Sequence, residues 1–198
     1  MNPVFPPEAL GVTSTIPIEV PLAAGRQIID LNNLFINAAD PLRYVRIAEA
    51  AGFPRNCCAW IRGLYGLIQD LRIRRVIFVT GGDCSNTHAL METLKPDLSE
   101  MLTFSYPYPG EKEALSREID RFCSAFAITR TQAEQKGTEL SKIRQMLAEL
   151  DRLTWQTDTI SGEDNFRWLV SSSDFQGNPA TYQSALSLFR CLKGRPGS

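Results

Sequence analysis

Residues 76–88 read Val76-Ile77-Phe78-Val79-Thr80-Gly81-Gly82-Asp83-Cys84-Ser85-Asn86-Thr87-His88. An apolar run rich in β-branched residues stops at two glycines and an aspartate, and a cysteine follows where a helix is expected to begin. In open α/β sheets, ligands bind beyond the carboxyl ends of strands and at helix N-termini. The stretch therefore predicts a strand, a turn and a helix, with Cys84 at the edge where ligands collect.

A second stretch with cysteines precedes it, Pro54-Arg55-Asn56-Cys57-Cys58-Ala59-Trp60. Asn56 is expected to cap a helix that extends to Leu71, because apolar residues then recur at helical spacing. A thiol at a helix N-terminus ionises more readily, since the positive end of the helix dipole stabilises the thiolate. Cys58 and Cys84 therefore suggest an iron–sulfur site, another metal site or redox chemistry. From spacing alone, two ordinary buried cysteines are the more common arrangement, because the chain has no Cys-x-x-Cys pair.

Strands and helices alternate through the first half of the chain. Further strands are predicted at 9–13, 27–31 and 101–105, and helices at 14–25, 40–52 and 85–94. Strands separated by helices of this kind imply βαβ units and a mostly parallel sheet. The first of these helices is expected to start at Ser14 or Thr15 and to be short or bent, because Pro21 falls late in its first turn.

The pattern changes to helices alone after residue 109. Apolar residues between 115 and 126 follow helical spacing, and a capping box at 131–134 is expected to open a longer helix. Asn178 and Pro179 open a last helix that ends at Gly194, while residues 171–174 are typical of capping or turn chemistry. The sequence thus predicts an α/β domain at 8–108 followed by a helical extension at 109–198.

Composition limits the function classes. The chain has 198 residues and a formal net charge of −1, from 21 Lys and Arg against 22 Asp and Glu. No basic surface predicts nucleic-acid binding, and no apolar run is long enough for a membrane span. The N-terminus lacks the pattern of a signal peptide, so a cytoplasmic protein is expected. Five scattered cysteines do not fit a disulfide scaffold, and a single histidine argues against a His-rich zinc hydrolase.

Four other residues are candidates for the chemistry. His88 falls one helical turn after Cys84, where it would donate a hydrogen bond to a cluster sulfur or to substrate. Glu19 is a candidate acid or base, and the loop with Ser14 and Thr15 offers hydroxyls and backbone N–H groups to an anion. Each has a plainer interpretation: a half-buried histidine, a solvated carboxylate and an ordinary loop. The loop carries neither a P-loop lysine nor a Gly-x-Gly pattern.

Several segments together resemble the 2-hydroxyacyl-CoA dehydratase family, which includes 2-hydroxyglutaryl-CoA dehydratase and benzoyl-CoA reductase subunits and the double-cubane reductases. The matching segments are 11–20, 23–25, 30–33, 52–56 with 58–61, and 82–90, followed by 106–108 and 168–175. The likeness is dense over about residues 10–108 and patchier afterwards. The motifs occur in the family's order, with Cys58 and Cys84 at the positions of its first two cluster cysteines.

The resemblance implies a flavodoxin-like α/β domain that holds part of a [4Fe–4S] cluster. It further implies low-potential electron transfer to a substrate such as an acyl-CoA thioester, with dehydratase (lyase) or reductase activity. An ATP-dependent activator would donate the electron, and a second α/β domain or subunit would supply further ligands. The family's third cysteine lies in that second domain, so this chain resembles a truncated member. The alternatives are a non-catalytic remnant or assembly module without a cluster, and a structural zinc-binding domain.

Overall fold

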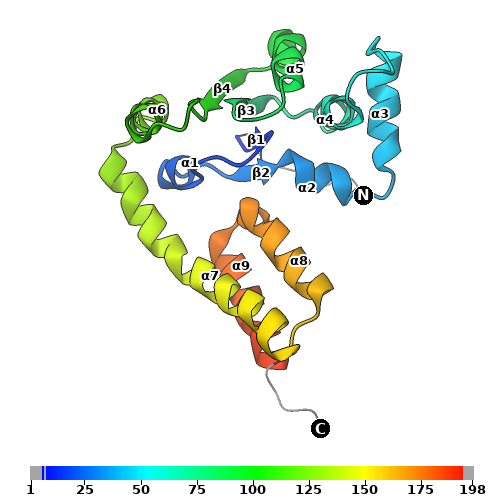
Figure 1. The fold of residues 1–198 in the computed structure, drawn as a ribbon. Coiled ribbons are helices and arrows are strands. Elements are labelled where there is room, and N and C mark those ends of the chain that lie inside the picture. Colours follow the sequence, from blue (N-terminus) through cyan, green and yellow to red (C-terminus); the bar gives the residue numbers. More distant parts are fainter. Residues whose placement is uncertain (1–5, 7, 194–198) are drawn as a thin grey trace.

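A four-stranded parallel sheet forms the centre of the molecule in the computed structural model, which describes residues 6 and 8–193. The strands are β1 (Leu10–Val12), β2 (Ile28–Asp30), β3 (Arg75–Gly81) and β4 (Glu100–Ser105). Their order is β2-β1-β3-β4, and every pair is parallel (Figure 1). This is the order of the first four strands of a flavodoxin-like sheet. The predicted α/β class with a parallel sheet and a helical extension is confirmed.

Helices cover both faces of the sheet, as expected for a doubly wound fold. The first face is covered by α1 (Glu19–Ala23), α6 (Lys112–Ala125), α7 (Arg130–Thr157) and α9 (Pro179–Lys193). The second face is covered by α2 (Leu31–Ile36), α3 (Pro41–Ala50), α4 (Ala59–Asp70) and α5 (Asn86–Leu94). Strand β3 serves both cores, because Ile77 and Val79 point to the first face while Val76 and Phe78 point to the second.

The helical extension shares a core with the sheet. Leu10 and Phe104 of the strands belong to the same buried cluster as Phe122 of α6 and Leu147 of α7. Figure 1 shows the long helix α7 running from α6 past α1 towards α8 (Gly162–Val170) and α9. The extension therefore supplies the apolar cover of one sheet face.

The edge strand β2 is joined to the segment between α8 and α9, which contains the 3-10 turns η2 (Ser171–Ser173) and η3 (Phe175–Gly177). The backbone N–H of Asp30 donates to Asp174 Oδ2 at 2.8 Å, and Asn33 Nδ2 donates to Ser173 Oγ at 2.9 Å. Asp174 also accepts the N–H of Gln176 at 2.9 Å, which confirms the predicted capping role of this segment. Burial raises the pKa of Asp174, and these backbone hydrogen bonds offset only part of that effect.

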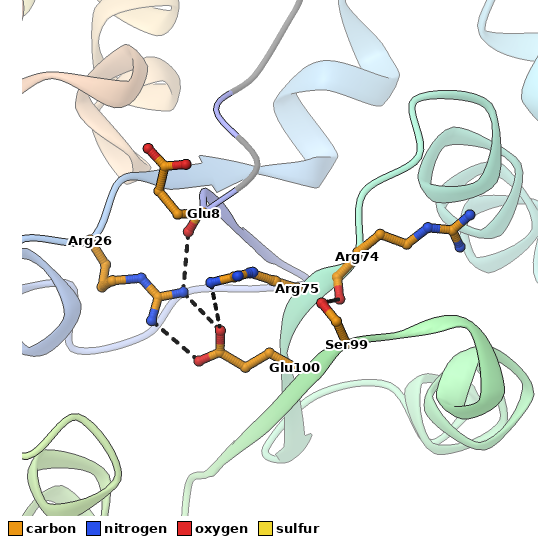
Figure 2. Close-up of polar contacts among 6 residues, drawn as sticks. All are labelled: Glu8, Arg26, Arg74, Arg75, Ser99 and Glu100. Carbon is orange, nitrogen blue, oxygen red and sulfur yellow. Dashed lines mark hydrogen bonds and ion pairs between the residues drawn. The ribbon is translucent and has the colours of Figure 1, made fainter.

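Charged side chains join the strands at the end of the sheet where all four strands begin, its amino-terminal edge (Figure 2). Glu100 of β4 accepts hydrogen bonds from Arg26 at 2.8 and 3.3 Å and from Arg75 of β3 at 3.4 Å. Arg26 also donates to the carbonyl of Glu8, just before β1, at 3.1 Å. Glu100 and Arg26 together thus link the segments that begin all four strands.

Three predicted helix starts are wrong by a few residues. The capping box of α7 is formed by Thr129 and Gln132 rather than by residues 131–134, because Thr129 has the extended backbone that an N-cap needs. The N-cap of α4 is Cys58 rather than Asn56, which lies in the preceding turn. Helix α1 starts at Glu19, so Ser14 and Thr15 belong to the loop before it.

Two helices, α2 and α8, are absent from the sequence prediction. Both are short, with 6 and 9 residues, and propensity alone rarely identifies helices of that length. The N-cap Asp40 with Pro41 after it is confirmed for α3, as is the start of α9 at Pro179. The predicted end of the last helix at Gly194 lies outside the described residues.

In the described part of the chain, no helix combines the length and the apolar character needed to cross a membrane.

Candidate functional site

The turn that follows β1 makes hydrogen bonds with residues near the ends of the other three strands, at the carboxyl edge of the sheet. Thr13 Oγ1 accepts the backbone N–H of Val79 in β3 at 3.1 Å, and the Thr13 carbonyl accepts a hydrogen bond from Asn32 Nδ2 at 3.0 Å. Tyr106, which follows β4, donates its hydroxyl to the carbonyl of Thr15 at 3.1 Å. This turn is therefore tied to the last part of β3 and to the segments that follow β2 and β4, at the edge where open α/β sheets bind ligands.

Cys58 is the N-cap residue of α4, and it is exposed. Its side chain makes no capping hydrogen bond. Two residues later, the Trp60 indole donates to Asn32 Oδ1 at 2.6 Å, which places the first turn of α4 beside the ends of β1 and β2. The buried Arg62 pairs with Glu49 of α3 and donates to the carbonyl of Cys57 at 3.1 Å. The sequence-based prediction of Cys58 at a helix start is confirmed.

Cys84 lies in the exposed turn between β3 and α5, and its neighbour Ser85 is the N-cap residue of that helix. Its backbone N–H donates to Asp83 Oδ1 at 2.7 Å, and its sulfur accepts a hydrogen bond from Asn86 Nδ2 at 3.4 Å. Because α4 and α5 contact each other on the same sheet face, Cys58 and Cys84 stand at the N-termini of adjacent helices.

The turn that carries Cys84 is pressed against the end of β4. A Cβ atom at Gly82 would lie 2.8 Å from Tyr106 Cβ, and Gly82 has a φ of 77°, a conformation that favours glycine. The backbone N–H of Tyr106 also donates to the Gly81 carbonyl at 3.0 Å. Gly82 is thus explained by a left-handed turn and the close approach of Tyr106, and Gly81 by the Ser105 hydroxyl, which would lie 2.1 Å from an added Cβ.

His88 folds back onto the strand that precedes it. Its Nε2 lies 2.7 Å from the carbonyl oxygen of Thr80, and since a carbonyl only accepts, Nε2 carries the proton in this arrangement. The side chain is exposed and occupied with the end of β3. The predicted hydrogen bond from His88 to a cluster sulfur or to substrate stays a prediction, and it would require Nδ1 or a different rotamer.

Ser14 and Thr15 lie in the turn that follows β1, where Ser14 is half-buried and Thr15 is exposed. The carbonyl of Thr15 is engaged by Tyr106, which in turn contacts the Cys84 turn at Gly82. The structure therefore brings the predicted anion-binding loop and the Cys84 turn to the two sides of one tyrosine. Binding of substrate by Ser14 and Thr15 stays a prediction.

Glu19 has a structural partner. As the first residue of α1, it forms an ion pair with Arg144 of α7, with Oε1 and Nη2 separated by 2.5 Å. Burial, and then the charge of Glu19, raise the pKa of Tyr106, so the carboxylate is close enough to act on that phenol electrostatically. An acid or base role for Glu19 stays a prediction, and it would compete with this ion pair between α1 and α7.

The donor set predicted from the sequence for a metal or cluster consists of Cys58 and Cys84, and both thiols are exposed. Cys123 is buried in the core at 2% exposure, and Cys191 lies exposed on α9. Within residues 6 and 8–193, no three His, Cys, Asp or Glu side chains are grouped as metal ligands. Two exposed thiols fit the thiolate chemistry of an iron–sulfur cluster, but only as part of its ligand set.

A cavity of about 570 Å³ lies elsewhere, beside the edge strand β2. Its walls come from β2, α2, α8 and the following turns, and they include Ile28, Asn33, Phe166, Arg167 and Asp174. Its size is suitable for a small ligand. None of the predicted site residues lines it, so it is separate from the cysteine pair.

Comparisons with protein-family models and with curated proteins identified no relative of this chain. No family model matches the chain, and no curated protein matches it. The resemblance drawn from the segments around Cys58 and Cys84 therefore stays a prediction.

Sequence reasoning gave no role to three residues that organise this edge: Asn32, Trp60 and Tyr106. Each lies within three residues of a strand end or a helix start at the carboxyl edge, and that position was the available signal. Their partners, however, come from segments 28 to 91 residues away in the sequence. Only the assembled sheet brings such pairs into contact.

Proposed function

We propose that this chain is an iron–sulfur protein of the 2-hydroxyacyl-CoA dehydratase and reductase type, in which Cys58 and Cys84 are two ligands of a [4Fe–4S] cluster. One observation carries the proposal: two exposed thiols stand at the N-termini of two contacting helices, α4 and α5, at the carboxyl edge of a parallel sheet. Thiolates are the usual ligands of such clusters, and helix N-termini favour negative charge.

The remaining ligands come from a partner in this proposal. Two thiolates are fewer than the three or four that a cluster normally takes. A second α/β domain or subunit therefore faces the carboxyl edge and completes the ligand set. When bound, the cluster would transfer single electrons at low potential, delivered by an ATP-dependent activator, to a substrate such as an acyl-CoA thioester.

The chain's own residues would hold and orient the group. Asn86 donates to the Cys84 sulfur, and a hydrogen bond to a ligand sulfur stabilises its negative charge. The loop with Ser14 and Thr15 is the proposed anion site for the substrate, and His88 a proposed proton donor. These roles follow from position at one edge of the sheet.

The test is anaerobic reconstitution with iron and sulfide, followed by metal analysis and EPR of the reduced protein. Substitutions Cys58→Ser and Cys84→Ser should each lower the bound iron several-fold, while Cys191→Ser should leave it unchanged. Equal iron in all four proteins would remove the ligand assignment. A colourless protein that binds one zinc through the same cysteines would support the structural zinc alternative. A well-folded protein that binds neither metal would mean that this chain alone is at most half of a site, and the reconstitution would then be repeated with the partner; failure there as well would support the remnant or assembly module.

A further inference from the structure

The position of Cys58 depends on contacts made by its neighbours. Its own side chain makes no capping hydrogen bond, and Cys58 is the last of the eight residues that connect α3 to α4. Arg62 holds the carbonyl of the neighbouring Cys57, and Trp60, which is 42% exposed although it is a large aromatic residue, joins this end of α4 to the carboxyl edge of the sheet.

Trp60 links α4 to the turn that follows β1, and it does so through Asn32. The indole Nε1–H donates to Asn32 Oδ1 at 2.6 Å, and the Asn32 amide donates to the Thr13 carbonyl at 3.0 Å and to Asp30 Oδ1 at 3.0 Å. The Trp60 ring also meets Phe35 of α2 edge-on, with centroids 5.2 Å apart. The side-chain hydroxyl of Thr13 in turn accepts a hydrogen bond from the backbone N–H of Val79 in β3, five residues before Cys84.

We propose that Trp60 and Asn32 are positioning residues of the cysteine pair. The hydrogen-bonded series Trp60–Asn32–Thr13 fixes the first turn of α4 against the strand whose turn carries Cys84. It thereby sets the separation of the two sulfurs before any metal binds. This inference rests on the proposed function, since it assigns a purpose to the spacing of Cys58 and Cys84.

Physical chemistry favours such a device here. A two-thiolate site on loops would lose conformational entropy on binding a metal, and a site held in advance avoids that loss. Residues that orient ligands without touching the metal typically change metal affinity by about 10–100-fold when they are altered. The indole N–H is the group to remove, because phenylalanine keeps the contact with Phe35 and lacks the donor.

The test uses cadmium(II) alone as the probe of the metal-free, reduced full-length chain. In a Cys57→Ser, Cys191→Ser background, the affinity is measured from the sulfur-to-cadmium charge-transfer absorbance. Trp60→Phe should weaken cadmium binding about tenfold. Trp155→Phe, which alters an exposed tryptophan of α7, should leave it unchanged.

A second variant separates positioning from general destabilisation. Asn32→Ala should weaken cadmium binding at least as much, because it also removes the hydrogen bond to the Thr13 carbonyl. The double variant should be no worse than Asn32→Ala alone, because Trp60 acts through Asn32. Urea unfolding of each variant checks that the fold is retained. A merely structural role would lower stability and leave the cadmium affinity as it was.

The contrary outcomes are distinct. If Trp60→Phe binds cadmium as tightly as its parent, the positioning role is refuted and the proposed function stands. If the parent binds cadmium equally well after Cys58→Ser, the two cysteines are not a ligand pair. That result would overturn both the positioning role and the ligand assignment.

Discussion

Single residues at the two edges of the sheet do different work. At the carboxyl edge, the side chains of Asn32 and Tyr106 donate hydrogen bonds to backbone carbonyls of the turn after β1 and so join that turn to the segments that follow β2 and β4. At the amino edge, the charges of Arg26, Arg75 and Glu100 join strand beginnings. Substitutions at the amino edge should therefore change stability without touching the candidate site.

Glu100→Gln should lower the free energy of unfolding by about 1–2 kcal/mol, because two partly buried guanidinium groups lose their shared carboxylate. Urea denaturation measures the change. The matched control is Glu163→Gln, whose ion pair with Arg167 is more than 70% exposed on both sides and should contribute less than about 0.5 kcal/mol. Equal effects for the two substitutions would argue against a structural role for the cluster in Figure 2.

Asp174 should make stability depend on pH. Burial raises its pKa above the ordinary value of 3.8, so the folded state binds this proton more tightly than the unfolded chain does. The resulting stability is present at acid pH and is lost as the pH rises through the raised pKa. As the pH falls from 7 towards 4, the native protein should therefore gain stability relative to Asp174→Asn. The unfolding free energy of the native protein minus that of the variant should rise by at most about 1.4 kcal/mol per pH unit. A constant difference across that range would contradict it.

At the scale of elements, close helix contacts depend on glycine. Helix α4 carries Gly63 and Gly66 on its buried side, and a Cβ at Gly66 would lie 2.0 Å from the backbone oxygen of Tyr44 in α3. A Cβ at Gly63 would meet the ring of Phe35. The absence of side chains at these positions lets α4 lie close to α2 and α3, and so places its N-cap, Cys58.

Gly66→Ala should destabilise the protein by about 1–3 kcal/mol, even though alanine is the better helix former, because backbone cannot move aside as a flexible side chain can. Thermal or urea unfolding checks this prediction. The control is Gly162→Ala at the first residue of α8, where no atom lies within 4 Å of the added carbon. There the change should be neutral or stabilising by up to about 1 kcal/mol. Tolerance of alanine at residue 66 would mean that α3 and α4 are further apart than described.

At the scale of the whole molecule, the sheet needs the helical extension. The face formed by Leu10, Val12, Val79 and Phe104 is covered by α6, α7 and α9. The boundary at 108–109, predicted from a change in sequence pattern, crosses this shared core. A division into an α/β domain and an extension stays a prediction about organisation, whereas the packing joins the two parts.

A fragment of residues 1–108 should not unfold cooperatively, because it would expose one whole face of the sheet to water. The measurement is urea unfolding followed by circular dichroism, with the full-length chain as the reference. A sharp transition of the fragment, at a midpoint near that of the full chain, would show that the extension is dispensable for folding.

The sequence by itself determined the strands, most of the helices and the parallel sheet. An apolar run that ends at Gly81-Gly82, and a helix that begins at an N-cap such as Asp40, depend on local periodicity and turn chemistry. The sequence carries both signals directly. It also placed Cys58 and Cys84 at helix starts. It misplaced the caps at Thr129 and Cys58 by two residues, since several neighbouring residues can cap and packing selects among them.

Only the tertiary structure decided the partners of the site residues. Trp60 reaches Asn32, Tyr106 reaches Thr15 and Glu19 reaches Arg144 because sheet assembly brings distant segments to one edge or one face. Periodicity gives the face on which a side chain lies, but not the neighbour it meets there. That is why the position of the two cysteines at helix starts could be predicted from the sequence, while the residues proposed to hold them in place became visible only in the fold.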